Sequence, residues 1–78
     1  MKHREVYEWA VKGIRAEVEK LDNDIRKGLR LIEQYEKGEQ PKTPKTRNEI
    51  WAIIQRKREE IEELDRKRIG LEFDIEEL

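Results

Sequence analysis

A seven-residue repeat of apolar residues runs through both halves of the chain, on either side of a segment that contains two prolines. In the first half the repeat positions are Tyr7, Val11, Ile14, Val18, Leu21, Ile25, Gly28, Ile32 and Tyr35. In the second half they are Ile50, Ile54, Lys57, Ile61, Leu64, Arg68, Leu71, Ile75 and Leu78. Steps of four and three residues alternate without a slip, which keeps one stripe of a helix facing a partner helix. The repeat therefore predicts an all-α chain whose two long helices pack along this seam.

The composition supports this prediction and limits the size of the core. Of the 78 residues, 47% are charged and only 35% are hydrophobic. Without the repeat this balance would indicate disorder, but with it the balance is typical of a coiled coil. A single domain this small rarely gains more than ~3–5 kcal/mol from one core. We therefore expect the hairpin to assemble as a homodimeric four-helix bundle or to dock on a partner protein.

Charge and cysteine content narrow the expected environment. Eighteen basic and 19 acidic residues leave a net charge of −1, so no global field attracts nucleic acid or a membrane surface. There is no cysteine, and no apolar run is long enough for a signal peptide or a membrane span. We expect a cytoplasmic protein.

The helix boundaries follow from turn and capping residues. We expect one helix over about residues 4–37, a linker over 38–46 and a second helix over about 47–78, all in a single domain. Gly38 is a suitable left-handed stop for the first helix, and Pro41 and Pro44 cannot continue it. Thr46 and Glu49 form a capping box for the second helix. A competing cap is Thr43 followed by Pro44, which would start that helix a turn earlier.

The distribution of charge favours an antiparallel hairpin. Basic residues begin the first helix and acidic residues end the second, so an antiparallel fold places them side by side. Near the turn, Glu33 and Glu36 are expected to lie near Lys45 and Arg47. A linker of about nine residues also suits adjacent antiparallel helices. Two registers remain open: Leu21 faces Ile61, or a shift of one heptad places Ile25 against Leu64.

Apolar residues outside the seam gather at the two ends of the expected hairpin, and Trp and Phe in such places are typical interface anchors. Gly28, at a seam position, would admit a close helix or a large side chain such as Trp51. The candidate residues of a partner or oligomer interface are Trp9, Gly28, Leu29, Leu31, Trp51, Ile53, Ile69 and Phe73.

Two basic residues, Lys57 and Arg68, interrupt the apolar seam of the second helix. Their long stems can extend past the seam so that the charge stays in water. Alternatively, they point inward and pair with Glu17, Asp22 or Asp24. The sequence leaves both orientations open.

Motifs of chemistry are sparse. His3 is the only histidine, and one histidine does not build a typical metal site. The chain also has no phosphate-binding loop and no nucleophile motif. We expect no enzymatic activity, no cofactor, no metal and no small-molecule substrate. A small helical-bundle enzyme with a polar pocket around Lys57 or Arg68 is one alternative.

A second alternative is a hairpin dimer that binds nucleic acid. The basic turn offers Lys42, Lys45 and Arg47 as candidate phosphate contacts, and basic clusters around Arg56 and Arg66 lie on the second helix. These clusters flank an acidic run, which favours a solvated helix face over a binding site.

The sequence therefore predicts a small non-enzymatic module for protein–protein interaction, of the adaptor, regulator or inhibitor type. Its expected partners are a second copy of itself or an unidentified protein, and neither a membrane nor nucleic acid is expected. The expected geometry resembles small dimeric hairpin regulators of bacteria, plasmids and phages, which is a likeness of fold alone.

Overall fold

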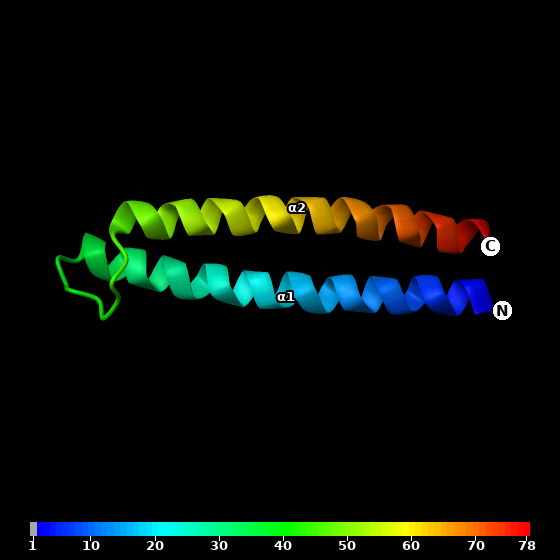
Figure 1. Cartoon of the computed structure of the whole chain (residues 1–78), viewed down its shortest axis with the longest axis horizontal. Coiled ribbons are helices and arrows are strands. Elements are labelled where there is room, and N and C mark those ends of the chain that lie inside the picture. The colour runs from blue at the N-terminus through cyan, green and yellow to red at the C-terminus, as the bar shows by residue number, and fades with distance from the viewer. Residues whose placement is uncertain (1) are drawn as a thin grey trace.

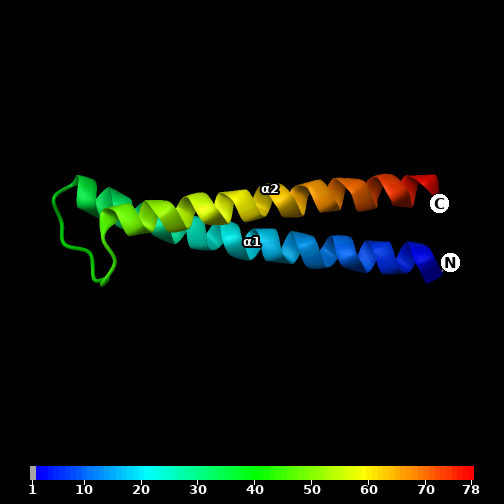
Figure 2. The same cartoon turned by 45° about the horizontal axis from the view of Figure 1, so that its top comes forward.

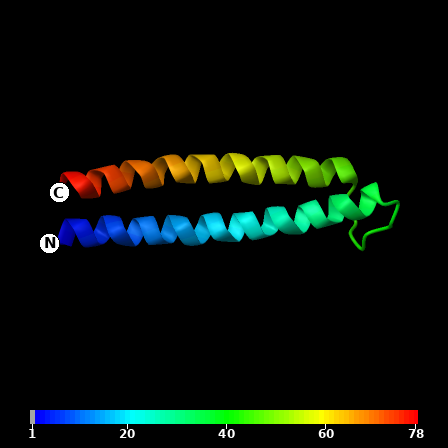
Figure 3. The ribbon, with the colours of Figure 1, turned by 180° about the vertical axis from the view of Figure 1, so that it is seen from behind.

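The computed structural model of the protein describes residues 2–78 as two long helices. Helix α1 spans Lys2–Glu36 and helix α2 spans Arg47–Glu77. They run antiparallel and side by side, so the two ends of the chain lie at one end of the hairpin and the linker at the other (Figures 1 and 2). The hairpin measures 56 × 17 × 15 Å. Seen from behind, the helices stay adjacent along their whole length (Figure 3), and the described residues contain no strand.

Helix α1 ends in the turn that its sequence predicts. Gly38 adopts a φ of 76°, the left-handed conformation that glycine adopts most easily. The amide of Gly38 donates to the Tyr35 carbonyl at 3.1 Å, and the amide of Glu39 donates to the Gln34 carbonyl at 2.9 Å. These two bonds form a Schellman motif, which satisfies carbonyls that the helix end would otherwise leave without partners.

Helix α2 begins at the preferred cap. The hydroxyl of Thr46 accepts a hydrogen bond from the amide of Glu49 at 3.2 Å, so Thr46 is the N-cap. The competing start at Thr43 is wrong, because the Thr43 hydroxyl accepts from the Lys45 amide at 3.3 Å within the linker. Tyr35 then fixes the linker to α1, because its hydroxyl donates to the Lys45 carbonyl at 2.7 Å.

The heptad seam is confirmed. Six apolar seam residues are buried, namely Val11, Leu21, Ile25, Ile32, Ile50 and Ile54. The other seam positions are half-buried, including Lys57 and Arg68, and only Leu78 is exposed. A single pair of helices covers each seam residue from one side only, which explains why so few are fully enclosed.

Burial is uneven along the hairpin. We call residues 20–36 of α1 with 47–62 of α2 the turn half, and residues 2–19 with 63–77 the terminal half. Ile25, Ile32, Ile50 and Ile54 form the core cluster, and all four lie in the turn half. Among residues 3–78, whose burial the structure describes, every buried side chain except Val11 belongs to the turn half. The core of the protein therefore sits beside the linker.

Gly28 shows which register the two helices adopt, because it lies against Ile54. A Cβ atom at this position would lie 3.0 Å from both Cδ1 and Cγ1 of Ile54, so only glycine permits this approach without a shift. In the register shifted by one heptad, Gly28 would face Ile61. The structure therefore has the register centred on the linker. The neighbour of Gly28 is Ile54 and not Trp51, because Trp51 lies on the flank of the seam and Ile54 points into it.

Candidate interaction surfaces

Two rows of residues flank the seam, one along each edge of the hairpin. Residues seven apart share one face of a helix, and antiparallel pairing places equivalent rows of α1 and α2 on the same edge. We call the first edge the Leu31 edge: Ala10, Glu17, Asp24 and Leu31 of α1, and Ile53, Glu60, Lys67 and Asp74 of α2. We call the second edge the Leu29 edge: Glu8, Arg15, Asp22, Leu29 and Glu36 of α1, and Trp51, Arg58, Asp65 and Glu72 of α2.

The turn half of the Leu31 edge is hollowed. Seam residues including Gly28 and Ile54 line this hollow together with the half-buried side chains of Leu31 and Ile53. Charged residues also line it, and three of the four are cationic: Asp24, Lys27, Lys45 and Lys57. The hollow therefore combines apolar surface with a net positive charge.

The turn half of the Leu29 edge carries a flatter apolar surface. Leu29 is 36% exposed and Trp51 is 37% exposed, so each is partly covered by its own hairpin. A second hollow on this edge is lined by Ile25 and Ile61 with a balanced set of charges: Asp22, Arg26, Arg58 and Glu62.

The most exposed of the large apolar side chains lie in the terminal half. Trp9 is 80% exposed, Phe73 is 62% exposed and Ile69 is 58% exposed. Their heptad positions place them on the outer faces of the helices, so each side chain points away from the seam and from the other helix. We call these three residues together the terminal aromatic surface, which consists of Trp9 on the outer face of α1 and Ile69 with Phe73 on the opposite, outer face of α2.

The interface candidates of the sequence therefore separate into three groups. Trp9, Ile69 and Phe73 lie exposed on the outer faces, and the turn-half residues divide between the two edges. Gly28 differs from the rest, because the small residue serves packing within the chain.

Lys57 and Arg68 reach the flanks of the seam. Lys57 Nζ lies 3.2 Å from the Asp24 carboxylate on α1, and Asp24 is one of the three partners that the sequence proposes. Arg68 pairs along its own helix, with Asp65 at 3.5 Å and Glu72 at 3.0 Å. Both side chains are about a quarter exposed, at 28% and 25%. The stems therefore cover the seam while the charged groups reach carboxylates beside it.

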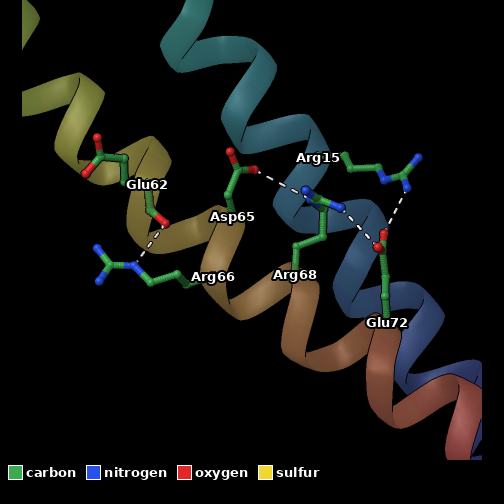
Figure 4. Close-up of polar contacts among 6 residues, drawn as sticks. All are labelled: Arg15, Glu62, Asp65, Arg66, Arg68 and Glu72. Atoms are coloured by element: carbon green, nitrogen blue, oxygen red, sulfur yellow. Dashed lines mark hydrogen bonds and ion pairs between the residues drawn. The ribbon is translucent and has the colours of Figure 1, made fainter.

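A network centred on Glu72 joins the helices in the terminal half (Figure 4). One carboxylate oxygen accepts from Arg15 of α1 at 2.9 Å, and the other accepts from Arg68 at 3.0 Å. The Arg15 hydrogen bond, followed by the Arg68 hydrogen bond, holds the pKa of Glu72 below its usual value, although partial burial opposes this. The hydrogen bond to Glu72 raises the pKa of Arg68 above its ordinary value.

Glu72 was not singled out from the sequence. Arg68 four residues earlier gives a local signal for an ion pair. The bond to Arg15 depends on the helix register, which the sequence left open. In the same region, Arg66 donates to the backbone carbonyl of Glu62 at 3.4 Å and lies apart from the network (Figure 4).

The candidate phosphate contacts are all exposed at the turn, but they are not equivalent. Arg47 forms an ion pair with Glu36, as the sequence predicts, so its charge is already compensated. The Lys45 backbone is held by Tyr35 and Thr43. Its side chain lines the hollow on the Leu31 edge, whereas Lys42 lies in the linker.

Among residues 2–78, no group of three or more His, Cys, Asp or Glu side chains is placed to hold a metal ion. Neither described helix has an apolar stretch of the length that crosses a bilayer.

The fold and its surfaces define an antiparallel two-helix hairpin with exposed aromatic residues at its terminal end. Comparisons of the chain with protein-family models, with curated proteins and with solved structures find no match.

Proposed function

We propose that the chain is a small non-enzymatic module for protein–protein interaction, of the adaptor, regulator or inhibitor type. It presents helical surfaces to another protein and pairs with a second copy of itself. A cytoplasmic location is part of this proposal and agrees with the absence of cysteine.

The terminal aromatic surface carries this proposal. Trp9 is 80% exposed on α1, and Phe73 and Ile69 are exposed one helical turn apart on α2. Isolated apolar residues on a surface are ordinary, but Trp is the residue most enriched among the anchors of protein interfaces. The helices hold these anchors on a rigid frame, so a partner binds them without first ordering a loop.

The experiment compares partner capture by the wild-type chain and by a Trp9→Ala, Phe73→Ala double variant. A chain immobilised through the linker is exposed to a lysate of its source cells, and retained proteins are quantified by mass spectrometry. We expect a specific protein to be retained by the wild-type chain and its retention to fall at least about tenfold in the double variant, since anchor residues each contribute about 2 kcal/mol or more.

The matched control is Glu19→Ala, an exposed substitution on α1 that leaves the terminal aromatic surface intact. Circular dichroism melts of all variants check the fold, and exposed substitutions should change the free energy of unfolding by no more than about 0.5 kcal/mol. Equal retention by the wild-type chain and the double variant would contradict the proposal.

A further inference from the structure

We infer that the Leu31 edge is the surface through which two copies of this chain pair. The two hairpins lie with their turns at opposite ends and form a four-helix bundle in which α1 packs on α1 of the second copy. This inference rests on the proposed interaction function and assigns one surface to self-association, which leaves the terminal aromatic surface for another protein.

The exposed area of the hairpin is large enough to require such a partner. The accessible surface is 6485 Å² for a chain of 9.5 kDa. A compact monomer of this mass exposes about 5,000 Å². The hairpin therefore exposes roughly 1,400 Å² more than a compact protein does, and a stable interface takes about 800 Å² from each partner. A face-to-face pair of hairpins would cover an area of this size.

The charges along the Leu31 edge favour a second copy of the chain as the partner, and they favour one orientation of that copy. The hollow in the turn half is lined by Lys27, Lys45 and Lys57 with only Asp24 in opposition. The next hollow along the same edge is acidic and is lined by Glu17, Glu60 and Glu63 with only Lys67 in opposition. Two hairpins with their turns at opposite ends bring the basic half of each against the acidic half of the other. With both turns at one end, the lysines would meet and repel.

The sequence of α1 offers a consistent register for this pairing. When two antiparallel α1 helices cross near Asp22, Lys27 of each copy reaches the level of Glu17 of the other. Lys20 and Asp24 then also face each other across the two copies, so both pairs join opposite charges. Because the arrangement is two-fold symmetric, each pair occurs twice.

Apolar residues match in the same register. Leu31 of one copy reaches the level of Gly13 of the other. A Cβ built on Gly13 meets no atom within 4 Å, so the hairpin itself leaves open space there. A glycine in the middle of a helix costs about 1 kcal/mol relative to alanine. Packing within the chain explains Gly28, whereas the space beside Gly13 fits a side chain from a second copy.

The Leu29 edge lacks this complementarity. Ion pairs between the helices cross it at both ends, from Arg15 to Glu72 and from Glu36 to Arg47. Its hollow near Ile25 is lined by two acidic and two basic residues, so charge there does not favour one orientation of a second copy over the other. The Leu31 edge is therefore the better surface for a second copy.

The first test measures absolute mass by light scattering over a concentration series. We expect the wild-type chain to be a dimer that dissociates on dilution. A Gly13→Leu variant should be monomeric at concentrations where the wild-type chain is a dimer, although its helix content should rise because leucine forms helix better than glycine. Ala16→Leu, one turn along on the outer face, is the matched control and should leave the dimer intact.

The second test exchanges charges between positions that are too far apart to meet within one chain. Glu17 and Lys27 are ten residues apart on one helix, or about 15 Å along its axis. Lys27→Glu and Glu17→Lys should each weaken the dimer about tenfold, since each breaks two ion pairs and introduces two repulsions. The double variant should regain most of the wild-type affinity.

A wild-type chain that stays monomeric would overturn the inference. So would a Gly13→Leu variant that dimerises with wild-type affinity. A double charge variant whose dimer affinity is no higher than that of either single variant would also overturn it. Partner capture through Trp9 and Phe73 is measured separately. Its loss in the double alanine variant would support the proposed interaction with another protein even if the chain is monomeric.

Discussion

The turn half and the terminal half of this hairpin carry the same heptad repeat but bury it to different degrees. Beside the linker, Ile32, Ile50 and Ile54 are almost fully enclosed, and Gly28 lets the helices approach closely. Among the described side chains of the terminal half, Val11 alone is buried, and ion pairs around Glu72 join the helices instead. A regular seam therefore sets which residues face each other, whereas the size of the side chains at each seam position sets how tightly the helices pack.

The difference has a sequence cause in α2. Ile50 and Ile54 are consecutive seam positions with branched side chains that pack against Gly28, whereas the terminal half has no glycine on its seam. Each half also has one basic seam residue, Lys57 in the turn half and Arg68 in the terminal half. An arginine at this position covers the seam with its stem but keeps its guanidinium among carboxylates. The terminal half therefore has less apolar contact between its own helices and more exposed apolar surface for other molecules.

Ile54→Ala should break the turn half and produce the largest effect. Ile54 is 1% exposed, and loss of such a side chain lowers the free energy of unfolding by about 2–5 kcal/mol. Because a domain of this size rarely gains more than ~3–5 kcal/mol from its core, the variant should be largely unfolded at room temperature. Urea titration followed by circular dichroism measures the change.

The paired control is Ile69→Ala in the terminal half. Ile69 is 58% exposed, so its truncation should shift the same titration by no more than about 0.5 kcal/mol. Equal losses for the two variants would remove the distinction between the halves.

A smaller effect is expected from Thr46→Ala, which removes the cap of α2 in the turn half. The Thr46 hydroxyl is the acceptor for the Glu49 amide, and loss of such a cap costs about 1 kcal/mol. Thr43→Ala is the matched control, because that hydroxyl accepts only a bond within the linker. Thermal melts should rank Thr46→Ala well below Thr43→Ala, and the reverse ranking would reassign the cap.

The smallest effect is a pH dependence confined to the terminal half. Because the pKa of Glu72 is lowered in the folded chain, its contribution to stability is complete above the unfolded pKa of a glutamate. This contribution is lost as the pH falls through the lowered pKa of the folded state. Amide hydrogen exchange should show that acid loosens residues near Glu72 more than residues near Ile54. In Glu72→Gln this added acid sensitivity should be absent, and its persistence would assign it to other carboxylates.

Much of the fold follows from the sequence. The heptad positions predict the seam, Gly38 predicts the end of α1, and Thr46 predicts the cap of α2, because each depends on local geometry or on position around one helix. The register did not follow, because a heptad repeat is unchanged by a shift of seven residues. The observed register places Gly28 against Ile54, a contact that can be seen only when both helices are in place.

The candidate surfaces followed from the sequence less completely. The apolar residues outside the seam are identifiable as such, but their division between two edges and the outer faces depends on how the helices pair. Of the two neighbours that the sequence suggests for Gly28, a close helix or a large side chain such as Trp51, the structure shows the close helix, and Trp51 flanks the seam at 37% exposed. The network around Glu72 was missed for the same reason, since Arg15 and Glu72 are 57 residues apart in the chain.

The antiparallel course of the helices has a practical consequence for attaching other molecules. The start of α1 and the end of α2 lie at the same end of a 56 Å rod, so the hairpin suits insertion into a surface loop of a host protein (Figure 1). An affinity tag at either terminus would sit in the half that carries Trp9 and Phe73 and would crowd them. Insertion at the exposed Gln40 places the tag in a loop at the far end of the rod, where added residues are tolerated best.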